Sequence, residues 1–224
     1  KSFTYLKSKK IKTIISTGGY MSLPICISAK ILNLKVILFE PNLVLGRSNL
    51  FFLNYCSSIL CYSEEIRNFP IKFKRKIKLI PPLLRKSVYF EKKYKNNFEK
   101  KIKILIIGGS QGADFFQKNL KDTILKLSEK VELEVMHQTN DKNKENLKSF
   151  YEKNHIKYEL FNFKKNLFKN ANEINFCITR AGASSLAELV QINLPFVAIP
   201  FPYAKDNHQY YNALYYKKLN CCWM

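Results

Sequence analysis

The chain has 224 residues, 46% of them hydrophobic, which is enough for one or two domains with sizeable cores and excludes an intrinsically disordered protein. Its 38 basic and 17 acidic side chains give a formal net charge of +21. This charge has three explanations: a nucleic-acid partner, an anionic membrane surface, or a compositional bias toward lysine. The lysines are scattered along the chain, which favours compositional bias together with membrane contact.

The first half of the chain is predicted to alternate strands and helices. Residues 12–16 form a buried strand, Thr17-Gly18-Gly19-Tyr20 a turn, and residues 22–33 a helix. Two adjacent glycines at a strand-to-helix junction permit positive φ and close approach of a ligand to the backbone. A tight structural turn is the alternative.

Further strands are expected at residues 36–40 and 59–62, with a helix starting at residues 46–49. The run 72–78 alternates basic and apolar residues, which is typical of a solvated edge strand and also of a phosphate contact. Residues 86–101 are rich in lysine, asparagine and glutamate, a composition that indicates a linker. We therefore expect a first domain over 1–85, a linker over 86–101 and a second domain over 102–224.

The second domain begins with the pattern of a doubly wound fold. An apolar strand at 103–107 leads into Gly108-Gly109-Ser110-Gln111-Gly112-Ala113 and then a helix. The Rossmann spacing G-x-G-x-x-G is absent, which counts against a nicotinamide enzyme. His137 follows a predicted strand at 131–136, where open α/β sheets bind ligands, although a lone histidine is more often structural.

The segment from Thr179 to Asp206 carries the strongest signal. A strand is followed by the small-residue turn 180–185 and a helix starting near Ser184, so unpaired amides and the positive end of the helix dipole predict a phosphate site. Glu188 lies one turn into this helix, a position suited to a carboxylate that accepts hydrogen bonds from a ribose diol. Asp206-Asn207-His208-Gln209 forms a polar cluster after the next strand. The alternative is an ordinary βαβ unit whose helix is capped by serines.

Three motifs resemble the MurG family of glycosyltransferases in the same order: I-S-T-G-G-Y-M-S-L-P, I-I-G-G-S-Q-G-A, and R-A-G-A-S-S-L-A-E followed by K-D-N-H-Q-Y-Y-N-A. The resemblance covers nearly the whole chain. It implies an α/β, GT-B fold with two Rossmann-like doubly wound domains facing a cleft, an N-terminal acceptor and membrane-side domain and a C-terminal UDP-sugar donor domain. Compared with the family, both ends look cut, and the loop expected to carry the catalytic base is among the missing parts. We therefore assign no catalytic residue and expect the chain alone to be inactive.

The resemblance also implies the reaction and its partners. The family transfers N-acetylglucosamine (GlcNAc), with inversion, from UDP-GlcNAc to undecaprenyl-pyrophosphoryl-MurNAc-pentapeptide (lipid I). The implied donor-binding residues are Gly109, Ser110, Gln111, Lys164, Ala183, Ser184, Ser185, Glu188, His208, Gln209, Arg85 and Asn42, and the implied acceptor-binding residues are Gly18, Gly19, Tyr20 and Glu40. The family's H-E-Q-N reads F-E-P-N at residues 39–42, His208 replaces a glutamine, and Arg85 lies one residue farther from its proline. The histidine leaves the sugar specificity open.

Cofactor and location follow from what the sequence lacks. There is no D-x-D motif to hold a metal against a diphosphate, and the six cysteines show neither a C-x-x-C pair nor zinc-type spacing, so we expect no metal and reduced cytosolic thiols. No apolar run approaches the ~20 residues needed to span a bilayer. We expect a peripheral protein on the cytoplasmic face of an anionic membrane.

Two other functions remain open. One is another GT-B lipid glycosyltransferase, such as a diacylglycerol glycosyltransferase, whose acceptor loops would differ around residues 18–49. The other is a basic nucleic-acid-binding α/β module, which ranks last because the sequence has no clustered arginines and no platform of stacking aromatics.

Overall fold

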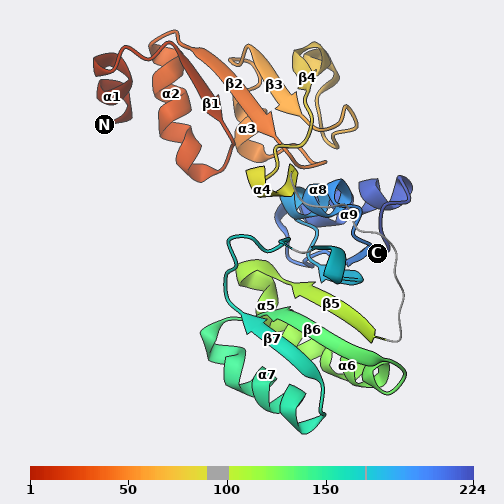
Figure 1. The fold of residues 1–224 in the computed structure, drawn as a ribbon. Coiled ribbons are helices and arrows are strands. Elements are labelled where there is room, and N and C mark those ends of the chain that lie inside the picture. Colours follow the sequence, from red (N-terminus) through yellow and green to blue (C-terminus); the bar gives the residue numbers. More distant parts are fainter. Residues whose placement is uncertain (90–100, 170) are drawn as a thin grey trace. The chain divides into compact units, whose positions relative to one another are not determined.

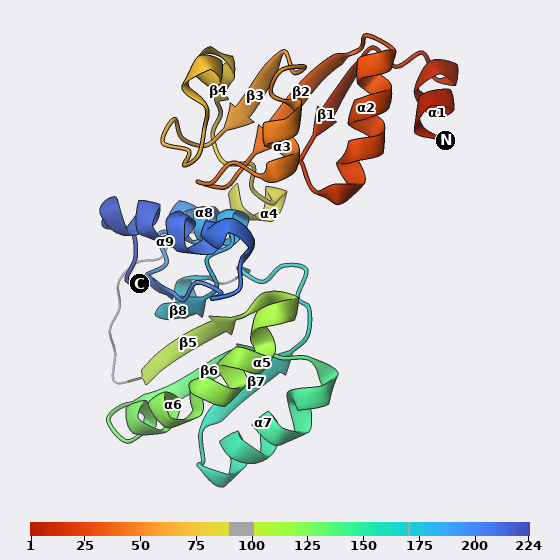
Figure 2. The same cartoon turned by 180° about the vertical axis from the view of Figure 1, so that it is seen from behind.

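The computed structural model describes residues 1–89, 101–169 and 171–224, and the side chains of all of these except 110–113. Contacts between Cα atoms divide the chain into two compact units. Unit 1 consists of Lys1–Leu83 and Tyr203–Asn212, and unit 2 of Leu84–Pro202 and Ala213–Met224. Each unit contains one parallel sheet with helices beside it (Figures 1 and 2), which confirms the expected α/β class. Most of the predicted linker, residues 90–100, lies outside the described chain.

Unit 1 is a four-stranded parallel sheet in sequential order, with strands β1 (Thr13–Ser16), β2 (Lys35–Glu40), β3 (Ser58–Cys61) and β4 (Ile77–Leu79). Its helical segments are α1 (Ser2–Ser8), η1 (Tyr20–Ser22), α2 (Leu23–Ile31), α3 (Arg47–Phe52), η2 (Ile71–Lys76) and η4 (Lys205–Asn207), together with the start of α9 (His208–Lys218).

Strand β2 shows why this sequence forms a half-buried strand. Val36, Leu38 and Glu40 point to the buried face, in the period of two that a strand imposes. Val36 and Leu38 join the hydrophobic core of unit 1. Glu40 puts a charged side chain at a core position, so its carboxylate needs partners within the protein.

The run 72–78 is a strand only at its end. Residues 71–76 form the 3₁₀ segment η2, and β4 pairs with β3 from Ile77 to Leu79. The Lys76 ammonium donates to the backbone carbonyls of Leu53 (2.6 Å) and Cys56 (2.7 Å). The alternation of basic and apolar residues did not reveal this contact, because its acceptors lie 23 and 20 residues earlier in the chain.

Unit 2 is a five-stranded parallel sheet in the order β7-β6-β5-β8-β9. The strands are β5 (Lys101–Ile107), β6 (Glu132–Gln138), β7 (Lys157–Phe161), β8 (Phe176–Thr179) and β9 (Phe196–Ala198). The helical segments are α4 (Lys86–Tyr89), α5 (Gly109–Asn119), α6 (Lys121–Ser128), α7 (Asp141–Lys153), η3 (Ala171–Glu173), α8 (Ala183–Gln191) and the end of α9. The strand order reverses direction between β5 and β8, as in a doubly wound fold.

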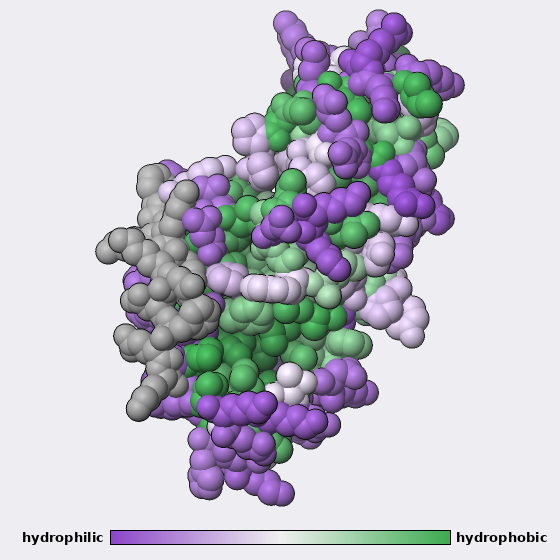
Figure 3. All heavy atoms as spheres, turned by 90° about the vertical axis from the view of Figure 1, so that its right-hand side faces the viewer, coloured by the Kyte–Doolittle hydropathy of each residue, from purple (hydrophilic) through white to green (hydrophobic). Residues whose placement is uncertain are grey.

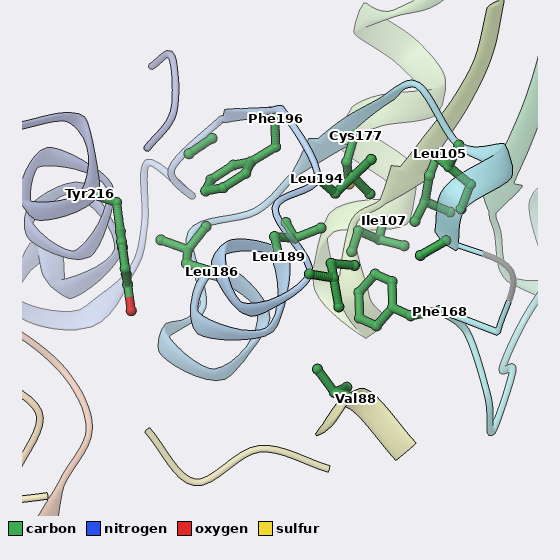
Figure 4. Close-up of a cluster of buried hydrophobic side chains, with 14 of the residues drawn as sticks. Val88, Leu105, Ile107, Phe168, Cys177, Leu186, Leu189, Leu194, Phe196 and Tyr216 are labelled. Carbon is green, nitrogen blue, oxygen red and sulfur yellow. The ribbon is translucent and has the colours of Figure 1, made fainter. Parts of the chain in front are cut away.

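Alternation along β5 divides the core of unit 2 between the two faces of the sheet. Ile104 and Ile106 pack in a cluster with residues of α5, α6 and α7. Leu105 and Ile107 pack in a second cluster, with residues of α8 (Figure 4). On the face drawn in Figure 3, hydrophilic residues are spread over much of the surface, and hydrophobic residues also gather in a continuous area.

Candidate functional site

The carboxyl ends of β5 and β8 lie side by side in unit 2, where Ile107 is paired with Thr179. The loops after these strands lead into α5 and α8, whose first amides have no partner within their own helix. The strand order switches direction between these two strands, and doubly wound sheets bind ligands at such a point. The structure therefore brings the two predicted phosphate loops to one edge.

Gly109 begins α5 with φ at +64°, a conformation that favours glycine. A Cβ atom at this position would meet no described atom within 4 Å, so the backbone conformation and not lack of space requires the glycine. Its N–H donates to Gln138 Oε1 at 2.9 Å, so this amide already has a partner within the protein. The predicted contacts through Ser110 and Gln111 fall on side chains outside the described ones.

Helix α8 begins without a side-chain cap. Gly182 is the N-cap residue in extended conformation, and no side chain that the structure describes accepts from the first amides. Leu186 N–H closes the first turn onto the Gly182 carbonyl at 3.0 Å. The serines of this turn therefore do not cap the helix, which argues against the alternative of a plain serine cap. The amides of Ala183, Ser184 and Ser185 remain positioned to bind an anion.

Glu188 is buried at 5% exposure and forms a bidentate ion pair with Arg85. Arg85 Nε donates to Oε1 at 2.7 Å and Nη2 to Oε2 at 2.6 Å, and these hydrogen bonds raise the pKa of the Arg85 guanidinium. The structure thus brings two predicted donor-binding residues into direct contact. A ribose diol at Glu188 would have to share its carboxylate with Arg85 or displace it.

Arg180 is a residue that the sequence analysis did not select. Its side chain is buried, and its guanidinium lies over the rings of Phe115 and Phe116, 4.4 and 4.9 Å from their centroids. Nη1 donates to the carbonyl of Pro200 at 3.2 Å, whereas Nε and Nη2 have no hydrogen-bond partner in the described structure. Burial lowers the pKa of this guanidinium. Arg180 therefore ties α5 to the loop after β9, and its position in the small-residue turn was the available signal.

His137 lies inside β6, not after it, and is buried at 1% exposure. Its Nδ1 is 2.8 Å from the Tyr151 hydroxyl, and the Tyr151 ring stacks on Tyr158. Burial lowers the pKa of His137 to about 4 and raises that of Tyr151. These contacts give His137 a structural position in the core.

The buried His137 predicts acid sensitivity. Its pKa is about 4 in the folded state against 6.5 when unperturbed, so the unfolded state binds the extra proton between these values and stability falls as pH falls. From pH 6.5 to pH 5 we expect a loss of roughly 1.5 kcal/mol in the free energy of unfolding, measured by urea denaturation. The lowered pKa of Glu134, about 2, adds a loss only at lower pH.

The matched control for this pH effect is the exposed His155. His137→Gln should flatten the stability profile between pH 6.5 and pH 5, whereas His155→Gln should leave it unchanged. Equal slopes in the two variants would contradict the assignment to His137.

Lys164 forms an ion pair with Glu159, with Nζ 2.6 Å from Oε1. Its ammonium also lies 6.0 Å from the centroid of the Phe161 ring, so the side chain contacts residues of β7. The resemblance implies a main-chain contact to a base at residues 163–164, and that contact stays a prediction.

A pocket of about 620 Å³ lies in unit 1, at the carboxyl edge of its sheet. It brings together six of the predicted site residues, Gly18, Gly19, Tyr20, Glu40, Asn42 and His208. Two of these, Asn42 and His208, were predicted to bind the donor, and the structure places them beside the predicted acceptor residues. The half-buried Gln209 follows His208 on α9, and its predicted sugar contact stays a prediction.

Glu40 organises the loop at this pocket. Oε1 accepts from the Asn42 backbone (3.3 Å) and side chain (3.0 Å), and Oε2 accepts from Gly46 N (2.9 Å) and Asn49 Nδ2 (2.9 Å). Four donors compensate the buried charge. The carboxylate predicted to contact the acceptor therefore has a structural role in the loop, and a direct acceptor contact stays a prediction.

Two long-range contacts fix the rest of this loop. The fully buried Asn212 accepts from Leu43 N at 2.9 Å and donates to Asn42 Oδ1 at 3.1 Å. Arg47 forms a bidentate pair with Asp206, with Nη2 2.7 Å from Oδ1. Asn212, Asn49 and Arg47 were not predicted as site residues from the sequence, although each lies in a polar motif that was a signal for it.

Comparison with known proteins places the chain in a family. The sequence pattern of the glycosyltransferase family 28 C-terminal domain matches residues 103–224, more than half of the chain, and that of the N-terminal domain matches residues 1–61. The chain belongs to glycosyltransferase family 28. The resemblance stated above is thus confirmed at the level of the family.

Two relatives of this family 28 chain are UDP-N-acetylglucosamine–N-acetylmuramyl-(pentapeptide) pyrophosphoryl-undecaprenol N-acetylglucosamine transferases. The protein of Pelagibacter ubique (strain HTCC1062) is 52% identical over 224 residues, which are 100% of this chain and 63% of the relative. That of Rickettsia bellii (strain RML369-C) is 31% identical over 229 residues and is covered to 64%. The chain therefore spans less than two thirds of the length of these relatives.

The crystal structure of Acinetobacter baumannii MurG matches the fold with a TM-score of 0.76 at 24% sequence identity, over 99% of this chain and 62% of the other. This likeness confirms a GT-B-like α/β fold for the family 28 chain. In the described residues, no helix combines the length and apolarity that crossing a membrane requires. Nor do the described residues include a group of three or more histidine, cysteine or acidic side chains that could hold a metal ion.

The six cysteines of the family 28 chain are free thiols. Cys26, Cys56, Cys61 and Cys177 are buried, and burial raises the pKa of each, to about 12 for Cys61. At neutral pH these thiols stay protonated, which makes them poor nucleophiles. They therefore act as small core residues.

Proposed function

We propose that this chain is the part of a family 28 enzyme that binds UDP-GlcNAc through unit 2 and a lipid-linked acceptor through unit 1. The enzyme would be a hexosyltransferase that moves GlcNAc to undecaprenyl-pyrophosphoryl-MurNAc-pentapeptide in peptidoglycan synthesis. The observation that carries this proposal is 52% identity, over the whole chain, to a transferase of that name. The protein would act as a peripheral protein on the cytoplasmic face of the membrane.

Unit 2 is suited to stabilise the leaving group of the proposed reaction. An acceptor hydroxyl oxygen forms a bond to the anomeric carbon while the bond from that carbon to UDP breaks, and UDP leaves with the electron pair. The hydroxyl proton passes to a base, which we do not assign among the described residues. The uncapped amides of Ala183 to Ser185 would stabilise the negative charge that develops on the diphosphate, at roughly 3 kcal/mol for a well-aimed donor.

Arg180 adds a positive charge beside this edge of unit 2. Its guanidinium is held by rings of α5 and by the carbonyl of Pro200. This charge favours a diphosphate at the start of α8 and also fixes the loop after β9. Together with Glu188 as a partner for the ribose, these groups favour a nucleoside diphosphate sugar.

A transfer assay tests the proposed function in the complete natural protein that carries this sequence. With radiolabelled UDP-GlcNAc and a short-chain lipid I analogue, we expect labelled GlcNAc to appear in the lipid product. Glu188→Ala should lower kcat/KM roughly 100-fold, because charge-assisted hydrogen bonds to the ribose are lost.

Comparing several acceptors and donors in the same assay shows whether the protein is specific for lipid I and for UDP-GlcNAc. Diacylglycerol should not be glycosylated, and UDP-glucose should be a poorer donor than UDP-GlcNAc. The proposal would be rejected if the wild-type protein showed no transfer and Glu188→Ala had no effect on UDP binding. Transfer to diacylglycerol instead of the lipid I analogue would replace the acceptor but keep the donor assignment.

A further inference from the structure

Gln138, the last residue of β6, contacts the loops on both sides of its strand. Strand β6 lies between β5 and β7 in the sheet of unit 2 (Figure 1). The Gln138 carboxamide accepts through Oε1 from the backbone N–H of Gly109 (2.9 Å), in the turn after β5. It donates through Nε2 to the backbone carbonyl of Asn162 (3.1 Å), in the loop after β7. One side chain therefore joins two loops at the carboxyl edge of the sheet.

These two contacts together require a carboxamide. The Gly109 N–H can only donate and the Asn162 carbonyl can only accept, so the side chain between them must accept at one end and donate at the other. A glutamate would carry no proton to donate at neutral pH, and a methionine, of similar length, has no donor and only a weak acceptor. The two partners also fix which end of the Gln138 carboxamide is the oxygen.

The contact with Gly109 holds the first turn of α5. Gly109 has φ at +64°, and no described side chain caps this helix at its N-cap residue, Gly108. The loop after β6 holds α5 at a second point, where Asp114 Oδ1 accepts from the side-chain amides of Asn140 (3.0 Å) and Asn143. The amides that open α5 are therefore oriented by residues that end or follow β6.

The contact with Asn162 continues the pairing of β6 with β7 beyond the end of β7. Gln138 is paired with Phe161, and the Thr139 N–H donates to the Phe161 carbonyl at 2.8 Å. The next carbonyl, that of Asn162, accepts from the Gln138 side chain. Residues 163–164, at which a main-chain contact to the base is expected, follow directly. Gln138 therefore fixes the start of that segment.

We infer that Gln138 is a positioning residue that couples the base and the diphosphate of the nucleotide in donor binding. This role rests on the proposed function for its ligand but goes beyond it, because Gln138 acts on the nucleotide only through the two loops. Its carboxamide keeps the loop after β7 aligned with the opening amides of α5. A nucleotide that occupies both loops gains from this alignment, whereas a ligand of one loop gains only from the order of that loop.

Binding of UDP, uridine and inorganic pyrophosphate to the full chain, measured by displacement of a fluorescent UDP derivative, tests this coupling. Gln138→Met should weaken uridine and pyrophosphate about 2-fold each but UDP roughly 20-fold, well above the product of the two smaller effects. A general loosening of unit 2 would not produce this excess. Gln191→Met is the matched control, because Gln191 is an exposed glutamine of the same unit, at the end of α8, and it should change none of the three affinities.

The coupling would be overturned if Gln138→Met weakened UDP only by the product of its effects on uridine and pyrophosphate, since the two contacts would then act independently. Equal effects of Gln138→Met and Gln191→Met would overturn it as well. If the wild-type chain bound UDP and pyrophosphate and Gln138→Met changed neither affinity, this role alone would be wrong and the donor assignment would stand. If the wild-type chain bound neither, the donor assignment and the role of Gln138 would both be rejected. Circular dichroism checks that both variants keep the fold.

Discussion

Glu188→Gln should abolish the preference of this protein for UDP over 2′,3′-dideoxy-UDP. A carboxylate that accepts two hydrogen bonds from the ribose diol gives roughly 10- to 100-fold discrimination, at about 1.5–3 kcal/mol for hydrogen bonds to a charged group. The amide of glutamine accepts through one atom only, and its NH₂ group also faces Arg85 Nη2 or Nε, which are donors. Calorimetric titration of both nucleotides measures the ratio of their affinities.

Arg85→Gln distinguishes a ribose contact from a purely structural ion pair. It removes the partner of Glu188 but leaves the carboxylate, so the preference for UDP over the dideoxy nucleotide should persist even if both affinities fall. Glu129→Gln, at an exposed acid of the same unit, should have no effect on either nucleotide. If Arg85→Gln and Glu188→Gln lost the preference equally, Glu188 would act only through Arg85.

Glu40→Ala is expected to have the largest effect on the stability of unit 1. It removes the acceptor of four hydrogen bonds and leaves the donors of Asn42, Gly46 and Asn49 without their partner in a buried loop. We expect a loss of roughly 3–5 kcal/mol in the free energy of unfolding, measured by urea denaturation with a probe in unit 1. A probe is needed because two compact units need not unfold in one transition.

Glu64→Ala is the control for this substitution, since Glu64 is an exposed acid of the same unit and should change stability by less than about 0.5 kcal/mol. Glu40→Gln should also be destabilising, because its NH₂ group would face two of the four donors. If Glu40→Ala left the unfolding midpoint unchanged, the carboxylate would be free for a ligand, as the family resemblance implies.

The local pattern of residues predicted most of the elements that lie next to the candidate sites. An apolar run of strand length predicted β5, and glycines at strand ends marked Gly18 and Gly109, both of which have positive φ. The small residues of the β8–α8 turn predicted a helix start, which lies at Ala183. Such signals act over a few residues, and they depend on backbone conformations that the neighbouring residues already determine.

Other properties depended on residues far apart in the sequence. Glu188 could be selected as a ligand contact from its spacing, but its ion pair with Arg85 joins residues 103 positions apart. Asn212 reaches Leu43 across 169 positions, and residues 203–212 accordingly belong to unit 1 and not to the predicted second domain.

The sequence by itself determined the α/β class, the family and the turns at which ligands are expected, because short-range spacing sets where strands end and helices begin. The tertiary structure alone decided that Glu40 is held by four donors and that His137 is a core residue. The reason is that burial and hydrogen-bond partners are properties of the packed chain, and no local spacing rule specifies which distant groups will meet.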